Sequence, residues 1–346
     1  MSIFDLITST EIASYWEILS QGDTDNYVGE ELFPDDKQLG IDLKWIVGAN
    51  GLPVMLKPSA YDAASIPRPR LSFDKMEAEM PYFKESKYID ERLRQQLNLV
   101  ISTGNQEYID AVVSKIFDDQ TDLLKGAKAT REVMRMMAIT TGVISIIANG
   151  QAYYYDYNVT HKGDAGVPWS DLENSDPMED MRAAKEEVKQ ETGATITRAI
   201  MNSVTWKNIR RNSSIVKQIY VLNQGAVKSI SDAMLKKYIK DELEIDVYVN
   251  DLMYKDVSGA SQKFVSDNTV SLLPAGDLGK TVFGTTPEES DLLSSNVANV
   301  AIVDTGVAVT TIEHADPVNV ETKVSMICLP SFPTADQVYI IDTEPA

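Results

Sequence analysis

Few residues of this 346-residue chain have the chemistry of an active site or a metal centre. The sequence holds two histidines, His161 and His314, and one cysteine, Cys328. Neither histidine lies beside a cysteine or in a helical metal-binding pair, and one cysteine cannot supply the repeated thiolates of a zinc motif. We expect His161 on the surface of a linker, His314 in a turn before Asp316-Pro317, and Cys328 in a buried strand. The sequence therefore predicts no metal site and no cofactor.

One glycine-rich stretch, PAGDLGKTVFG at residues 274–284, imitates part of a phosphate-binding loop. Such a loop needs a glycine five residues before its second glycine, and Pro274 stands at that position without an N–H donor. The residues after Gly279-Lys280-Thr281 look extended rather than helical. No G-x-S-x-G elbow or dinucleotide-binding glycine pattern is present. Acidic residues are so numerous that close carboxylates alone do not indicate catalysis, and no motif supports an enzyme.

Composition indicates a globular protein of about two domains. The apolar fraction is 43%, the charged fraction is 24%, and the formal net charge is −20. No apolar run reaches the roughly 18 residues of a membrane helix, and the first residues lack the basic region of a signal peptide. The negative charge excludes a whole-chain nucleic-acid footprint. The same negative charge is compatible with a protein shell that encloses nucleic acid without binding it tightly.

Apolar periodicity predicts several helices. One is expected near residues 3–19, and ESKYIDERLRQQLNLVIST, residues 85–103, is expected as another. Apolar residues then recur at three- and four-residue spacing from Tyr108 to Ala138, with Gly142 as the stop signal. The methionines of this stripe are expected in the core. Gly126 lies inside the pattern and is a candidate hinge.

Strand signals are strongest around Asn149-Gly150, where two β-rich runs meet at a dipeptide typical of a type I′ hairpin turn. The tyrosines at 153, 154, 155 and 157 fit a two-faced strand, and without interleaved basic residues they do not indicate base stacking. Asp176, Pro177 and Gly193 mark both ends of a helix. A second helix is expected over 229–243, with Met234 buried. Strands are expected at 245–249, 269–273, 300–303, 307–312 and in ETKVSMICLPSF and QVYIIDTE. The fold class is therefore α+β.

Residues 49–80 read as an extended arm with little core of its own. Four prolines interrupt it, Pro53, Pro58, Pro67 and Pro69. Each restricts its predecessor to extended backbone. Arg68 and Arg70 are cations on the arm of an acidic protein. They fit either a solvated loop or a charge contact with carboxylates of a neighbouring subunit.

Several stretches, in order, carry a family resemblance. They are ELFPDDKQLGIDLKWIVGANGLPVMLKPSA, SIPRPRLSFDKMEAEMP, DERLRQQ with EYIDAVVSKIFDDQTDLL, GVPWSDLENSDPMEDM, SDNTVSLLPAGDLGKTVFGTTPEESDL and DPVNVETKVSMICLPSFPTADQVYIIDTE. Together they resemble the major capsid protein E family of tailed phages, the lambda-like head proteins. The resemblance covers nearly the whole chain, although residues 194–260 match in pattern only and residues 1–30 are poorly anchored.

The resemblance implies the Hong Kong 97-type tailed-phage major capsid fold. We expect an N-terminal arm and entry strand at 1–48, an extended loop at 49–80, and a peripheral domain with a long spine helix and hairpin at 81–160. An axial domain is expected at 161–320, and C-terminal strands at 321–346 return to the peripheral domain. The extended loop would bury its surface on the next subunit, and Gly126 becomes a candidate spine hinge.

The function implied is a virion capsid protein that forms hexamers and pentamers of an icosahedral shell around double-stranded DNA. Its partners would be copies of itself, a scaffolding protein and a portal, with a decoration protein as a further candidate. Assembly in the host cytoplasm, no membrane partner and no catalytic activity are expected. The alternatives are a cellular nanocompartment shell of the same fold, which would hold an enzyme cargo, and a soluble α+β enzyme with a deep polar pocket.

Overall fold

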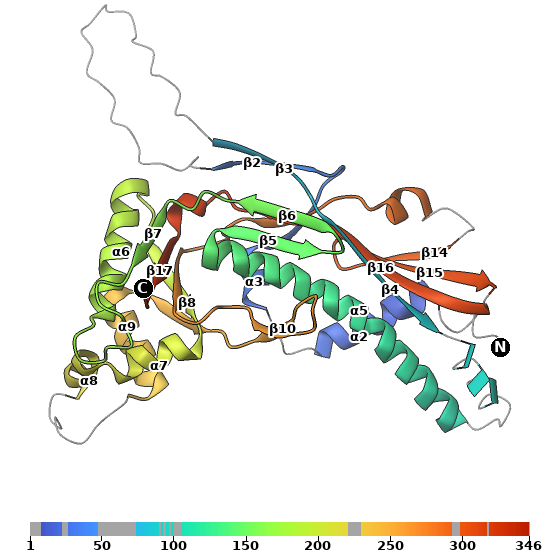
Figure 1. Ribbon diagram of the computed structural model, residues 1–346, viewed down its shortest axis with the longest axis horizontal. Coiled ribbons are helices and arrows are strands. Elements are labelled where there is room, and N and C mark those ends of the chain that lie inside the picture. Colours follow the sequence, from blue (N-terminus) through green and yellow to red (C-terminus); the bar gives the residue numbers. More distant parts are fainter. Residues whose placement is uncertain are drawn as a thin grey trace, which may run out of the picture. The chain divides into compact units, whose positions relative to one another are not determined.

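The computed structural model describes residues 8–22, 27–47, 74–89, 91–92, 95–96, 98–99, 106–220, 230–292, 298–316 and 318–345 (Figure 1). The chain divides into two compact units, each built from separated segments. Unit 1 combines Met1–Leu43, Ala78–Arg135 and Lys280–Ser331, and unit 2 combines Lys44–Glu77, Met136–Gly279 and Phe332–Ala346. The predicted domain boundaries stay predictions.

A six-stranded sheet organises unit 1. Its order is β1 (Asp35–Lys37), β13 (Lys280–Phe283), β16 (Val318–Ser331), β15 (Val307–Ala315) and β14 (Asn299–Val303), with β4 (Tyr82–Ile89) also paired to β16. The long strand β16 pairs antiparallel with β13, β15 and β4 along different parts of its length. Its second half is buried throughout. This confirms the strands predicted at 300–303 and 307–312 and the one predicted in ETKVSMICLPSF.

Helices complete unit 1. These are α2 (Ser9–Gly22), α3 (Val28–Leu32), the π-helical turn η1 (Glu288–Leu292) and most of α5 (Gln106–Thr141). The α2 side chains reach two other elements, because Tyr15 stacks on Phe117 of α5 and Ser9 bonds Asn299 of β14. The N-terminal helix is confirmed over Ser9–Leu19, and residues 3–7 lie outside the described residues.

The long helix α5 is confirmed, including its stop. Gly142 has φ +76°, and its N–H donates to the Ala138 carbonyl at 3.1 Å. Leu124 and Met134 on the predicted stripe are 1% and 0% exposed, so this part of the stripe is core.

The helix predicted at 85–103 is wrong over its first turn and a half. Residues Tyr82–Ile89 form strand β4, paired with Val320–Ile327 of β16. Tyr88 and Ile89 suit a strand as well as a helix, and the long partner decides between them. Residues 91–92, 95–96 and 98–99 are helical.

Unit 2 has a five-stranded sheet in the order β7 (His161–Asp164), β17 (Tyr339–Asp342), β12 (Thr269–Pro274), β8 (Ile196–Met201) and β9 (Asp246–Val249). Its helices are α6 (Pro177–Thr192), α7 (Ser203–Arg211), α8 (Ser213–Ile219) and α9 (Asp232–Leu243), with a 3-10 turn η2 (Ala335–Gln337). Small ribbons are β2 (Asp42–Val47) with β3 (Asp74–Glu79), β5 (Val143–Ala148) with β6 (Gln151–Asp156), and β10 (Met253–Lys255) with β11 (Ser261–Lys263). The first ribbon begins and ends in unit 1, which includes its residues 42–43 and 78–79. The strands predicted at 245–249 and 269–273 and in QVYIIDTE are confirmed.

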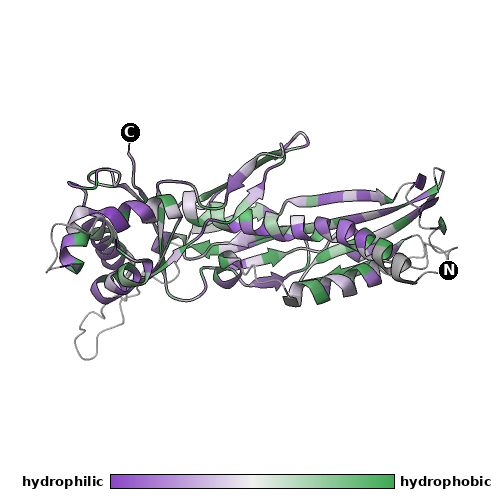
Figure 2. Ribbon diagram, turned by 90° about the horizontal axis from the view of Figure 1, so that it is seen from below, coloured by the Kyte–Doolittle hydropathy of each residue, from purple (hydrophilic) through white to green (hydrophobic). Residues whose placement is uncertain are grey.

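The predicted helix signals of α6 are confirmed. The Asp176 side chain accepts from the Glu179 N–H, Pro177 takes the first helical position, and Gly193 ends the helix at φ +77°. Met178 and Met181 face a core shared with Trp169 and Trp206. Single helices carry both hydrophobic and hydrophilic residues in Figure 2, as partly buried helices require.

Two further predictions in unit 2 have different outcomes. The hairpin is confirmed, because Asn149 and Gly150 have φ 49° and 75° between paired strands β5 and β6. The burial of Met234 is wrong, since it is 42% exposed near the start of α9. Leu235 and Ile239 on the same helix are fully buried. Among the described residues, no helix is long and apolar enough to cross a membrane.

Candidate assembly surfaces

The ribbon of β2 and β3 marks the base of the predicted extended loop. Residues 48–73 connect the two strands in the sequence and lie outside the described residues. They include Arg68 and Arg70, so the contacts predicted for these arginines stay predictions. The ribbon has a cross-strand ion pair of 2.6 Å between Lys44 and Glu77. Trp45 of β2 is 8% exposed and packs on Tyr157 at a centroid distance of 5.7 Å. A two-stranded ribbon is marginal alone, so this aromatic contact holds its base in unit 2.

The candidate hinge Gly126 lies in unbroken α-helix. Every residue of Gln106–Thr141 is helical, and the Gly126 carbonyl accepts from the Thr130 hydroxyl at 2.9 Å. A Cβ added at Gly126 would meet nothing within 4 Å. Close packing therefore does not explain the glycine, and its hinge role stays a prediction.

A buried charge cluster joins three segments of unit 1, and the sequence analysis missed it. Arg131 and Arg135 lie one turn apart on α5 and are 2% and 1% exposed. Arg131 Nη2 donates to Asp304 Oδ2 at 2.7 Å, in the turn between β14 and β15, and Arg135 Nη2 donates to Asp35 Oδ1 at 2.5 Å, in β1. Burial raises the pKa of Asp35, while the two guanidinium groups act to lower it.

Glu132 adds a buried carboxylate beside this cluster. Its side chain is 0% exposed, Oε1 accepts from the Gly29 N–H at 3.0 Å, and Oε2 lies 3.7 Å from Arg135 Nη1. Burial raises the pKa of Glu132 to about 7, even though Gly29 and Arg135 favour its charged form. Helix periodicity could have identified the cluster, because 131, 132 and 135 share one face of a long helix.

A second buried carboxylate, Glu288, ties η1 to the sheet. It accepts hydrogen bonds from Tyr82 of β4 at 2.8 Å, Ser325 at 2.9 Å and Lys323 at 2.6 Å. Burial acts to raise the pKa of Glu288, but these hydrogen bonds outweigh burial and lower it. Burial and Glu288 raise the pKa of Tyr82 to about 12. Like the arginine cluster, this arrangement fixes strands rather than activating a nucleophile.

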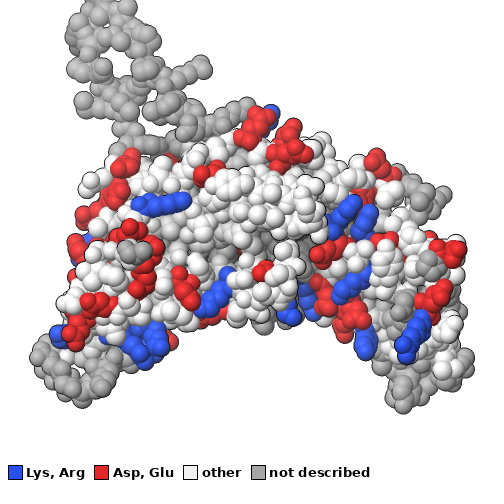
Figure 3. Space-filling view, viewed as in Figure 1, with Lys and Arg blue, Asp and Glu red and all other residues white. Residues whose placement is uncertain are grey.

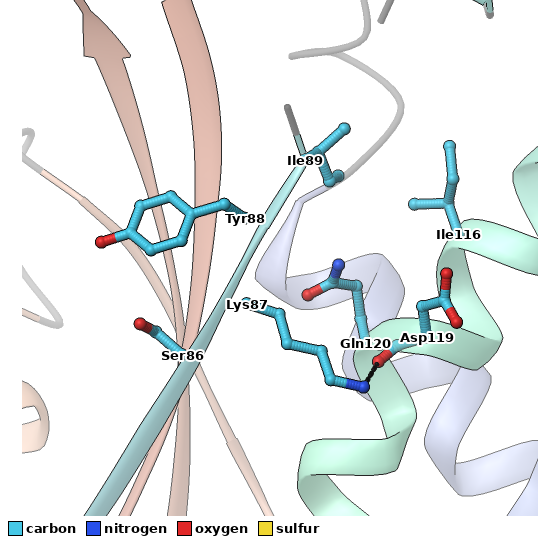
Figure 4. Close-up of a pocket in the computed structure, with 7 residues that line it drawn as sticks. All are labelled: Ser86, Lys87, Tyr88, Ile89, Ile116, Asp119 and Gln120. Carbon is cyan, nitrogen blue, oxygen red and sulfur yellow. Dashed lines mark hydrogen bonds between the residues drawn. The ribbon is translucent and has the colours of Figure 1, made fainter. Parts of the chain in front are cut away.

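A pocket of about 380 Å³ lies between β4 and α5 (Figure 4). Its lining is Ser86, Lys87, Tyr88, Ile89, Ile116, Asp119 and Gln120. Lys87 Nζ donates to the Asp119 carbonyl at 2.7 Å. The Lys87 ammonium group therefore binds helix α5 rather than pointing into the pocket as a ligand-binding group. The seven lining residues include no histidine or cysteine that could act as a base or thiolate nucleophile.

The predicted positions of both histidines are wrong. His161 is 3% exposed at the start of β7, and His314 lies within β15. Each has a ring nitrogen 3.0 Å from a glutamate, Glu191 and Glu321 respectively. The polar residues around His161 gave no sign that helix α6 and strand β17 would cover it. Cys328 is buried as predicted, and burial raises the pKa of its thiol to about 12.

These features are structural: buried ion pairs, a two-stranded ribbon and a long helix. A family model described as phage major capsid protein E matches residues 8–342. The chain belongs to the phage major capsid protein E family. The predicted resemblance is confirmed, and membership of this family makes the chain a structural capsid protein rather than an enzyme.

Solved structures show the same fold for this capsid protein. A phage-related protein of Bordetella bronchiseptica RB50 aligns at TM-score 0.57 and 12% identity over 97% of each chain. The putative capsid protein of an Escherichia coli CFT073 prophage aligns at 0.58 and 15%, over 97% of this chain and 99% of that one. The capsid of cyanophage A-1(L) aligns at 0.52 and 13%, over 93% and 95%. The predicted tailed-phage capsid fold is confirmed. No curated protein matches the sequence.

Proposed function

We propose that copies of this capsid protein assemble into hexamers and pentamers of an icosahedral shell that encloses double-stranded DNA. The observation that carries the proposal is the family match over residues 8–342. Similar solved structures include a putative prophage capsid protein and a cyanophage capsid. The shell would be part of the virion, assembled in the host cytoplasm with a scaffolding protein and a portal, and a decoration protein is a further candidate partner.

The charge distribution supports containment without sequence-specific binding. The chain has 52 acidic and 32 basic residues, and patches of Asp and Glu recur across the face shown in Figure 3. Carboxylates repel phosphates, so DNA held inside such a wall would stay free to move. The ribbon of β2 and β3 is consistent with the predicted extended loop at 49–80, which would make its contacts with neighbouring subunits.

Electron microscopy of the expressed protein, with and without a candidate scaffolding protein, tests the proposal. We expect closed shells or ring-shaped capsomers. A chain that stays a lone compact molecule under all conditions would overturn it. Particles purified from infected or induced cells should protect DNA from nuclease, whereas an enzyme cargo in place of DNA would indicate a cellular nanocompartment.

A further inference from the structure

Two elements of unit 2 bring together an imidazole and two carboxylates. His161 begins β7, while Glu187 and Glu191 lie four residues apart on α6 and so share one helix face. One ligand atom from each residue lies within 4.8 Å of the other two. Because β7 pairs with β17 and α6 packs on β17 (Figure 1), the sheet holds the imidazole beside the helix.

We propose that His161, Glu187 and Glu191 form a binding site for a divalent transition-metal ion, with Zn²⁺ as the favoured ion. Imidazole and carboxylate ligands lie about 2.0–2.2 Å from Zn²⁺. Two such ligands at tetrahedral or octahedral angles are separated by about 3.0–3.5 Å. His161 Nε2 and Glu191 Oε2 are already 3.0 Å apart. Glu187 is exposed, so its carboxylate can rotate into the third position.

The surroundings of His161 are those of a metal-binding histidine. Its other ring nitrogen, Nδ1, lies 3.2 Å from the Thr160 hydroxyl, which can accept the Nδ1 proton and leave Nε2 free to bind a cation. The imidazole is 3% exposed, so the surrounding atoms restrict its rotation. Metal-binding carboxylates are also commonly held by outer hydrogen bonds.

Tyr339 lies beside the second ligand. Its hydroxyl is close enough to interact with Glu187, and its ring stacks on His161 at a centroid distance of 6.2 Å. The Tyr339 hydroxyl packs against Gly163, which lies two residues after His161 on the same face of β7. A Cβ added at Gly163 would collide with this hydroxyl. Asp336 adds a third acidic group in electrostatic range of His161, and its Oδ1 is buried without a hydrogen-bond partner among the described residues.

The favoured ion follows from the donor set. One imidazole and two carboxylates suit a borderline divalent ion more than Mg²⁺ or Ca²⁺, which prefer sites of oxygen alone. Three protein ligands leave positions for water. Since the ligands come from β7 and α6, a bound ion would cross-link the edge of the sheet to its covering helix.

Calorimetric titration of the untagged, metal-free protein with zinc chloride tests the site. We expect one saturable Zn²⁺ per chain, a rise of a few degrees in Tm on binding, and much weaker binding of Mg²⁺. Glu187→Gln and Glu191→Gln should each weaken Zn²⁺ binding by at least about tenfold. Both side chains are exposed, so these variants should fold normally.

Matched controls are present in the same chain. Glu186→Gln removes an exposed acid of α6 outside the cluster, and His314→Asn removes the other histidine–glutamate pair; neither should alter Zn²⁺ affinity. His161→Asn should abolish the visible absorption of the Co²⁺-loaded protein. The buried Cys328 does not compete for metal in the folded chain. Absence of saturable Zn²⁺ binding, or equal binding by Glu187→Gln and Glu186→Gln, would overturn the proposal and leave the pair as a simple hydrogen bond.

Discussion

At the scale of the residue, Glu132 is the most informative side chain. It is an acid with a raised pKa of about 7, buried against the N-terminal segment through Gly29. The folded state binds its proton more tightly than the unfolded state, whose glutamate has an ordinary pKa near 4.5. The contribution of Glu132 to stability should therefore be greatest below the ordinary pKa and decrease as pH rises to about 7, by roughly 3 kcal/mol.

Glu132→Gln should remove that pH dependence. The amide oxygen can still accept from Gly29, and no charge is buried at high pH. We expect the variant to exceed the natural protein in stability by about 1–3 kcal/mol at pH 8 and to match it near pH 4. Urea unfolding of dissociated subunits across this range measures the difference. Glu31→Gln, an exposed neighbour on α3, is the control. Parallel pH profiles for all three proteins would contradict the assignment.

The charge of Arg131 should contribute far more to the free energy of unfolding than the charge of a surface arginine. Arg131→Ala leaves Asp304 without its buried cationic partner and leaves Asp35 with Arg135 alone, and it should cost about 3–5 kcal/mol. Arg182→Ala breaks an equally short pair, 2.6 Å from Glu179, but both side chains are exposed, so about 0.5 kcal/mol is expected. Thermal unfolding of the two variants measures this difference, and similar Tm values would refute the prediction.

Residue chemistry was the part least predictable from sequence. The burial of Cys328 followed from its apolar neighbours, but His161 is polar and follows no apolar run. It is buried because β17 and α6, distant in sequence, cover it. Asp35 and Asp304, which accept hydrogen bonds from Arg131 and Arg135, lie 96 to 173 residues away from them in the sequence. Without pairing information, a basic residue on a long helix looks like a solvated one.

At the scale of the element, local signals were reliable where they were complete. The cap of α6, its terminal glycine and the Asn-Gly turn of β5–β6 each depend on a few adjacent residues, and all three are confirmed. Strand β4 has no comparable signal. Its exposed middle has the charged composition of a helix surface, and its pairing with β16 overrides that local preference.

Gly126→Ala tests the candidate hinge in α5. Alanine lowers the backbone entropy of the unfolded chain and meets no neighbour here, so subunit stability should rise by about 0.4–1 kcal/mol. If Gly126 bends during maturation, particle size or expansion should change; unaltered particles and expansion would remove the hinge role. Gly29→Ala is the contrast, because its Cβ would collide with Glu132 and Arg135 and should destabilise by at least about 1 kcal/mol.

At the scale of the whole molecule, net charge should control association. Subunits of formal charge −20 repel one another, and salt screens that repulsion over about 8 Å at physiological ionic strength. Assembly should therefore be faster or more complete as salt rises from low concentration. Light scattering during assembly, with microscopy of the products, measures the effect. Unchanged assembly across that range would show that repulsion between acidic surfaces does not limit it.

The sheet of unit 1 also has a consequence for synthesis on the ribosome. Its partners β4, β13 and β15 are all translated before β16, which pairs with each of them. A nascent chain that has not reached residue 318 thus has the strands that neighbour β16 without the strand that joins them. The sheet of unit 1 can be completed only late in translation. Unfinished polypeptides would therefore lack a folded unit 1 and would be excluded from growing particles.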